Sequence, residues 1–100
     1  MRYDLHQDRD RLAVTLHGEV TMDDHGGFRA VIAQILTQKP RQVTYDLADV
    51  AQIDAGGLGM VLLSADAARE AGATLTLRGA RGQVARVLAS HRFSARMEVA

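Results

Sequence analysis

Cysteine is absent from this sequence, and neither sign of charge predominates. Without cysteine, a disulfide framework, a thiolate zinc site and a cysteine nucleophile are all excluded. The 12 basic and 12 acidic side chains give a formal net charge of zero. That balance argues against a nucleic acid or a membrane surface as a partner held by bulk charge.

Long apolar runs are absent as well. No run approaches the roughly 20 residues that a membrane-spanning helix needs, so we expect no direct membrane insertion. The first residues, Met1 to Asp4, are polar, and no signal-peptide core follows them. What the chain does have is 100 residues with 47% apolar side chains, which is enough to bury one core. We therefore expect a single domain over residues 1–100 and a cytoplasmic location.

An amino-terminal hairpin is predicted by alternating apolar positions. Residues 2–6 and 11–17 alternate with period two, as half-buried strands do. The segment Asp8-Arg9-Asp10 between them suits a tight turn. Gly18 then ends the second strand, and we expect residues 18–21 to form a loop.

Helices and further strands are expected to alternate along the rest of the chain. Pro40 marks the end of the first helix, because proline disfavours a helical residue before it. Thr21, Asp23 or Asp24 could cap the start of that helix. Apolar residues recur at helical spacing over Phe28 to Leu36, Leu58 to Ala65 and Val84 to Leu88. The remaining predicted elements are strands over 42–47 and 73–78, a loop over 48–54, and an edge strand around Met97 and Val99.

The predicted element order is therefore β-β-α-β-α-β-α-β. Strands that alternate with helices of this length need crossover connections, which make neighbouring strands parallel. We predict an α/β fold, with one small domain and a mixed, mostly parallel sheet of about four to five strands packed against helices.

A candidate functional segment, Ile53 to Gly59, lies between a predicted strand and a predicted helix. In open sheets of this kind, sites gather at the carboxyl ends of strands. Asp54 can cap the helix by accepting hydrogen bonds from its first turn, and Gly56 and Gly57 would leave those N–H groups sterically open. Such a helix start could hold an anion or the backbone of a partner. Alternatively, the glycines only permit a tight turn; the lysine and hydroxyl of a phosphate-cradling loop are absent.

Three motifs, in order along the chain, resemble those of the STAS domain, the family of anti-sigma-factor antagonists. Gly18-Glu19-Val20-Thr21 resembles the family's Gly-Glu-apolar-Asp loop. Tyr45 to Val50, followed by Ile53-Asp54, resembles the strand and loop before its switch site. The segment Asp54-Ala55-Gly56-Gly57-Leu58-Gly59 resembles the family's Asp-Ser-Ser/Thr-Gly-Leu-Gly. The predicted element order agrees with the family from residue 2 to about residue 99.

The resemblance implies a non-catalytic docking module without a metal or a cofactor. In the family, a kinase-type anti-sigma factor phosphorylates a serine or threonine at the start of this helix. The added charge is costly to desolvate in a packed interface, so docking is broken. The resemblance places the partner-binding residues at Gly18, Glu19, Val20, Thr21, Asp54, Ala55, Gly56, Gly57, Leu58 and Met60.

The sequence departs from the family at the phosphoacceptor position, which is Ala55. Gly56 follows, and neither residue has a hydroxyl, so we expect no phosphorylation there and a module that is permanently competent to bind. Thr21 stands where the family's loop usually has Asp, and the usual carboxyl-terminal helix is expected to be missing. Thr21 and Ser64 are alternative acceptors, although a capping threonine and a helix-packed serine are the simpler interpretations.

Catalysis and metal binding have weaker support in the sequence. The run Asp23-Asp24-His25 could suggest a metal or acid–base site, but no His-x-x-x-His spacing accompanies it. Asp46, Asp49 and Asp54 could pair for acid–base work. No nucleophile with a base stands at a recognisable spacing, so we expect no enzyme.

Two kinds of protein partner remain open. One is a GHKL-type anti-sigma kinase. The other is the ATPase subunit of a lipid-transport ABC complex, because STAS-like proteins also serve as accessory subunits of such complexes. A homodimer is possible too. A basic cluster at Arg78, Arg81 and Arg86 is usually a solvated face, and we expect no nucleic-acid partner.

Overall fold

One five-stranded sheet, in the order β1-β2-β3-β4-β5, forms the centre of the molecule. The computed structural model describes residues 1–89 and 98–99. Its strands are β1 (Arg2–Asp8), β2 (Arg11–Val20), β3 (Gln42–Ile53), β4 (Thr74–Arg78) and β5 (Glu98–Val99). Strands β1 and β2 are antiparallel and the later pairs are parallel. The predicted mixed, mostly parallel α/β sheet is therefore confirmed.

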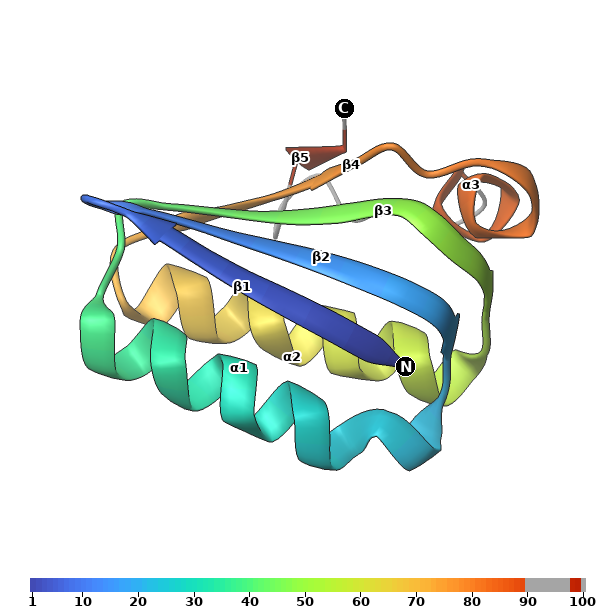
Figure 1. Cartoon of the computed structure of the whole chain (residues 1–100), viewed down its shortest axis with the longest axis horizontal. Coiled ribbons are helices and arrows are strands. Elements are labelled where there is room, and N and C mark those ends of the chain that lie inside the picture. The colour runs from blue at the N-terminus through green and yellow to red at the C-terminus, as the bar shows by residue number, and fades with distance from the viewer. Residues whose placement is uncertain (90–97, 100) are drawn as a thin grey trace.

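Two long helices cover one face of this sheet. The helices are α1 (His25–Gln38), α2 (Ala55–Glu70) and α3 (Gly82–Ala89), and a short 3-10 helix, η1 (Met22–Asp24), precedes α1. Figure 1 shows α1 and α2 side by side beneath the sheet, with α3 at the end where β3 finishes. None of the helices among the described residues is long and apolar enough to cross a membrane.

The core lies between the sheet and the two long helices. Alternate residues of the central strands point toward the helices and are buried, as period-two patterning requires. Phe28 of α1 and Tyr45 of β3 are fully buried, with ring centroids 6.4 Å apart. Each buried aliphatic side chain contributes about 1.5–3 kcal/mol, and the strands supply Leu12, Val14, Leu16, Val43, Leu47, Leu75 and Leu77.

Strands β2 and β3 run further than the sequence predicted. The expected loops over 18–21 and 48–54 are wrong for residues 18–20 and 48–53, which are strand. The two strands stay paired to Val20 and Ile53, with register shifts after Thr15 and Gly18. Such bulges insert an extra residue without ending the ladder, so the sequence loses its alternation while the strand continues.

The remaining elements agree with the predicted order. Helix α1 ends at Gln38, and Lys39 adopts a left-handed conformation (φ 48°, ψ 54°) before Pro40. Val99 belongs to the predicted edge strand, which pairs with β4. Met97 lies outside the described residues.

Candidate docking site

The start of α2 is capped by Asp54, as the sequence predicted. The Asp54 carboxylate accepts a hydrogen bond of 2.6 Å from the Gly57 N–H. The Asp54 N–H in turn donates to the Val20 carbonyl at 3.1 Å, which joins the helix start to the end of β2. Because the Gly57 N–H is already bonded, it is not available to an anion.

The two glycines at the helix start make room for neighbouring segments. A Cβ at Gly57 would lie 2.3 Å from the Val20 carbonyl oxygen. A Cβ at Gly56 would lie 2.6 Å from Cβ of Met22. These glycines therefore allow β2 and η1 to pack against the first turn of α2. The prediction of an open N–H group is wrong for Gly57, whose N–H is bonded to Asp54.

A hydrogen-bonded network holds η1 in this position. The Thr21 side chain accepts from the Asp23 N–H (3.2 Å), and Asp24 accepts from the Thr21 N–H (2.8 Å), forming a capping box. The Met1 amino group donates to Asp24 at 2.9 Å. Burial acts to raise the pKa of Asp24, but the bonds from Thr21 and Met1 outweigh it and lower that pKa. The network fixes the segment that carries Met22.

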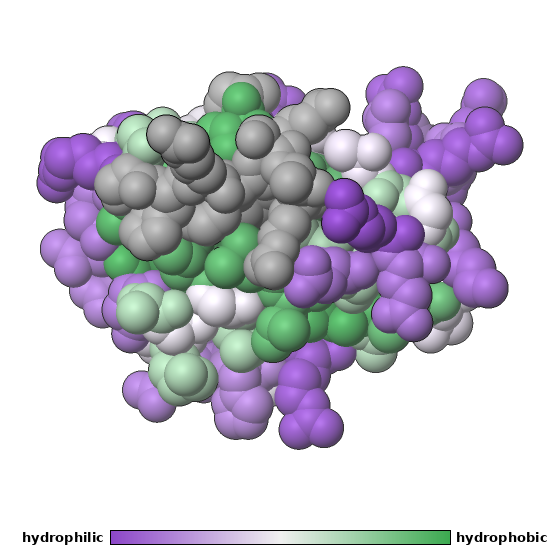
Figure 2. All heavy atoms as spheres, turned by 180° about the vertical axis from the view of Figure 1, so that it is seen from behind, coloured by the Kyte–Doolittle hydropathy of each residue, from purple (hydrophilic) through white to green (hydrophobic). Residues whose placement is uncertain are grey.

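Apolar side chains are exposed at this helix start and along the first half of α2. Met22 is 57% exposed and Leu63 is 51% exposed. Ala55, Gly59 and Leu63 are spaced by four residues, so they form one row along α2, and a Cβ at Gly59 would meet nothing within 4 Å. We call Met22, Ala55, Gly59 and Leu63 the helix-start surface. More generally, the side of the molecule seen in Figure 2 has apolar surface in the middle of the view and hydrophilic side chains toward its rim.

The residues that the sequence put forward for docking separate into two groups. Val20, Gly57 and Leu58 are buried, so they support the site from beneath. The others are at least partly exposed: Gly18, Glu19, Thr21, Asp54, Ala55, Gly56 and Met60. Met22 and Leu63 were not predicted, because no motif includes them and both stand outside the helical stripes. The only sign of them in the sequence is that each is a large apolar residue at a position outside the predicted buried stripes.

Helix α3 holds the end of β3 through one side chain. The Gln83 amide accepts from the Ile53 N–H at 2.9 Å and donates to the Ile53 carbonyl at 2.8 Å. Strand β4 stops pairing with β3 at Asp46 and Arg78. Gln83 thus takes the place of a missing strand beside Ile53, the residue before the Asp54 cap.

The candidate catalytic carboxylates are engaged separately. Asp54 caps α2, and Asp46 accepts from the Ala48 N–H at 3.0 Å. Asp49 is bonded to His17. Among the described residues, no group of histidine and acidic side chains could hold a metal ion. Ser64 is fully buried and its hydroxyl donates to the Met60 carbonyl at 2.9 Å.

A charged cluster crosses three strands on the sheet face turned away from α1 and α2. His17 of β2 bonds Asp49 of β3 at 2.5 Å and Asp4 of β1 at 2.9 Å. The bonds to Asp49 and then Asp4 raise the pKa of His17. The bond from His17 lowers the pKa of Asp49, and the charges of Arg2 and Arg81 lower it further.

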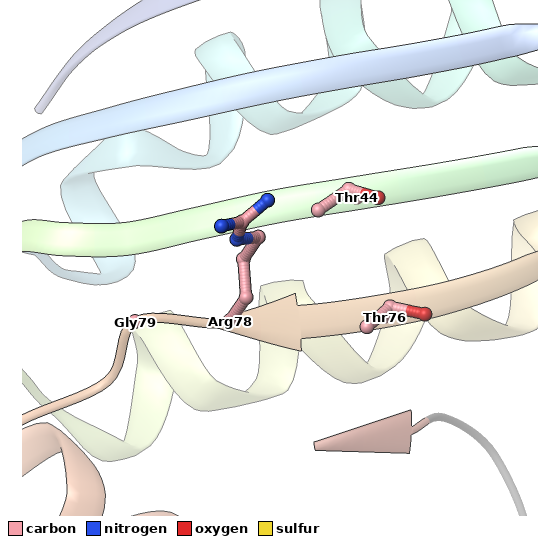
Figure 3. A pocket seen from close by; sticks show the side chains of 4 residues that line it. All are labelled: Thr44, Thr76, Arg78 and Gly79. Atoms are coloured by element: carbon pink, nitrogen blue, oxygen red, sulfur yellow. The ribbon is translucent and has the colours of Figure 1, made fainter. Parts of the chain in front are cut away.

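The neighbouring part of this face carries a shallow pocket lined by Thr44, Thr76, Arg78 and Gly79. Thr44 and Thr76 stand on adjacent strands, and Arg78 extends across toward β3 (Figure 3). Arg78 lies on β4, Arg81 precedes α3, and Arg86 is in the last turn of α3, so the predicted basic cluster is spread over three segments.

Comparison with known proteins places these features in a family. The model of the family described as Mlab, STAS domain, matches residues 3–97. A putative anti-sigma factor antagonist from Thermotoga maritima has a similar structure, with a TM-score of 0.85 at 18% identity, covering 97% of this chain and 84% of that one.

Two further solved structures share the fold at low identity. Phosphorylated SpoIIAA, a Bacillus cell fate determinant, matches with a TM-score of 0.75 at 18% identity, covering 99% of this chain and 91% of that one. RsbS from Moorella thermoacetica matches with a TM-score of 0.82 at 15% identity, covering 100% and 86%. No curated protein matches the sequence.

Proposed function

The chain belongs to the STAS domain family, and on that premise we propose that it is a non-catalytic docking module. Its partner is a protein regulator, in the first place a kinase-type anti-sigma factor, and it binds at the helix-start surface. The observation that carries the proposal is the exposed methyl group of Ala55 in the first turn of α2, with the exposed Met22 beside Gly56 and the exposed Leu63 about two turns further along the same helix row. Exposed apolar side chains grouped in this way suit a protein interface.

The support beneath the surface favours docking without rearrangement. Asp54 caps α2, Gly57 lies against Val20, and Gln83 holds Ile53. A site held in one conformation loses little entropy when it binds. We expect the helix-start surface to bind as it stands.

Regulation of this module lies outside its own phosphoacceptor position. Ala55 and Gly56 have no hydroxyl. The Thr21 hydroxyl is engaged in the cap of η1, and Ser64 is buried. We infer permanent competence to bind, with control exercised through the partner or through expression in the cytoplasm.

A second candidate function is that of an accessory subunit of a lipid-transport ABC complex, bound to its ATPase. The description of the matching family as Mlab, STAS domain, favours it, as does the missing acceptor, because a fixed subunit needs no phosphorylation switch. The same surface would serve either partner.

The deciding experiment introduces a charge at the surface without harming the helix. Ala55→Asp places a carboxylate in the first turn of α2, where the helix dipole stabilises it by about 0.3–1 kcal/mol. We expect the variant to fold normally but to bind its partner at least about tenfold more weakly, because the charge must be desolvated. Titration calorimetry against the kinase-type anti-sigma factor and against the ABC ATPase subunit of the same organism measures both affinities.

Ala33→Asp provides the matched control, since Ala33 is an exposed alanine on α1. It should leave both affinities unchanged. Equal binding by wild type and Ala55→Asp would refute docking at this surface.

A kinase assay tests the absence of phosphorylation. Incubation with the anti-sigma kinase and ATP should leave the wild-type chain unmodified, whereas Ala55→Ser should accept phosphate. Transfer of phosphate to the wild-type chain would show that another hydroxyl serves as acceptor.

A further inference from the structure

Strand β1 forms one edge of the sheet, and its outer side is open. In the described part of the chain, only β2 pairs with β1. Every residue of β1 except Tyr3 is exposed, and Leu5, a large apolar residue, is 43% exposed. An open edge of this kind can accept another strand through its main-chain groups.

The register of the hairpin defines which main-chain groups point outward. Asp8 and Arg11 flank a two-residue turn. In such a tight hairpin, the two flanking residues form a bonded pair, in which each N–H donates to the other residue's C=O. Because bonded and non-bonded pairs alternate in an antiparallel ladder, the next bonded residue of β1 is His6. The N–H and C=O groups of Tyr3, Leu5 and Gln7 therefore point away from β2.

We propose that the edge of β1 pairs with the same edge of a second copy of this chain, antiparallel and about a twofold axis at Leu5. In this register Leu5 bonds the partner's Leu5, and Tyr3 bonds the partner's Gln7. On the outer face, Arg2 stands opposite the partner's Asp8 and Asp4 stands opposite the partner's His6. Each pair occurs twice by symmetry, and each joins a carboxylate to a basic side chain.

The charge sequence of β1 selects this register over its neighbours. Because only every second residue of β1 points its N–H and C=O outward, the partner strand can shift only in steps of two residues. A shift one way places Asp4 opposite the partner's Asp4. A shift the other way places Asp4 opposite the partner's Asp8 and His6 opposite the partner's His6. Like charges directly opposite one another destabilise a strand pair, and larger shifts pair only one end of the strand.

The surroundings of β1 leave room for the second copy. Gly27 of α1 lies beside Tyr3, and Gln34 of α1 lies 3.5 Å from Gln7. Between them on the same helix face stands Ala30, which is exposed and small. A second α1 approaching across the axis therefore meets a methyl group. Asp4 bonds His17 through one carboxylate oxygen, and its other oxygen is directed to no described partner.

Sedimentation velocity of the full chain, from micromolar to submillimolar concentration, tests the association. The wild type should form a dimer over this range. His6 faces Ala13 within the sheet, so its replacement disturbs no charged neighbour there. We expect His6→Glu to weaken the dimer at least about tenfold, because two carboxylate pairs are created. His6→Lys should retain it. A wild type that stays monomeric, or equal weakening by both variants, would overturn the proposal.

A cross-link tests the position of the axis. Opposite residues in a bonded pair have Cα atoms about 5.5 Å apart, which a disulfide can bridge. In a chain without cysteine, Leu5→Cys should form a disulfide-linked dimer rapidly on mild oxidation. Leu63→Cys, at a comparably exposed site, should link slowly. Equal rates would place the axis elsewhere or exclude the dimer.

Discussion

Gly57 lies where the end of β2 passes against the first turn of α2. A Cβ added at Gly57 would lie 2.3 Å from the Val20 carbonyl oxygen, so a side chain there would push β2 and α2 apart next to the Asp54 cap. Gly57 is needed here because only a residue without a side chain allows this close approach. Gly59, two residues further, faces open space instead.

We predict opposite effects of alanine at these two glycines. Gly57→Ala should lower the free energy of unfolding by about 1–3 kcal/mol, as overpacking does. Gly59→Ala should raise it by about 0.5–1 kcal/mol, because alanine favours the helix and restricts the unfolded chain. Urea denaturation of the two variants measures both. If Gly57→Ala were as stable as the wild type, β2 and the first turn of α2 would not be in the close contact described above.

At the level of elements, Gln83 connects α3 to the strand that leads into α2. Its two hydrogen bonds reach Ile53, thirty positions away in the sequence. They satisfy main-chain groups that β4, ending at Arg78, cannot reach. Besides the buried side chains of Val84 and Leu88, this amide thus links α3 to the segment just before the Asp54 cap.

Replacing Gln83 should loosen the start of α2. Gln83→Ala leaves the Ile53 N–H and C=O without this partner, which should lower the free energy of unfolding by about 1–3 kcal/mol. Amide hydrogen exchange should quicken at Ile53, and Gln83→Glu should fall between alanine and wild type because it keeps only the acceptor. Gln34→Ala removes a surface amide and should change stability by less than about 0.5 kcal/mol. Unaltered exchange at Ile53 in Gln83→Ala would contradict the interpretation.

Much of the element order could be predicted from sequence, and the reasons are visible in particular residues. Leu12, Val14 and Leu16 alternate, and Pro40 ends a helix, because these signals are local. The carboxyl half of β3 was missed because Ala48, Asp49 and Ala51 to Gln52 do not alternate there. Strand pairing with β2, and not local preference, makes that segment a strand.

The candidate site was predictable only where its chemistry is local. Asp54 stands directly before the helix it caps, so its role could be read from sequence. The Gln83–Ile53 contact and the approach of Val20 to Gly57 join distant segments, and no spacing reports them. Exposure of Met22 and Leu63 likewise depends on how the layers pack.

Across the whole molecule, the sheet face turned away from α1 and α2 carries a charged cluster that links three strands in addition to their main-chain pairing. His17 lies on the middle strand, β2, and bonds Asp4 of β1 and Asp49 of β3. The opposite face is apolar and buried. A change in pH should therefore alter the interactions on the charged face of the sheet more than those on the apolar face.

We predict a stability that depends on pH through this cluster. The pKa of His17 is raised, so its contribution is complete below the ordinary histidine value of 6.5 and is lost as pH rises through the higher folded value. The pKa of Asp49 is lowered, so its contribution is complete above the ordinary value of 3.8 and is lost as pH falls through the lower folded value. The cluster should stabilise the fold most between those ordinary values.

Denaturation at a series of pH values checks this expectation. His17→Gln should flatten the profile, whereas His25→Gln, at the exposed start of α1, should leave it unchanged. By NMR titration, Asp49→Asn should bring the pKa of His17 down toward 6.5. An identical profile for wild type and His17→Gln would show that the cluster makes no difference to folding.

Because Ala55 has no hydroxyl to phosphorylate, the proposed regulation depends on the amounts of the two proteins. A docking protein that cannot be inactivated in place acts as a titrant: each copy removes one copy of its partner until one of them is exhausted. The response then turns sharply at equal amounts when binding is tight. In such a system the ratio of the two proteins, set by their synthesis and degradation, carries the information that a phosphate would otherwise carry.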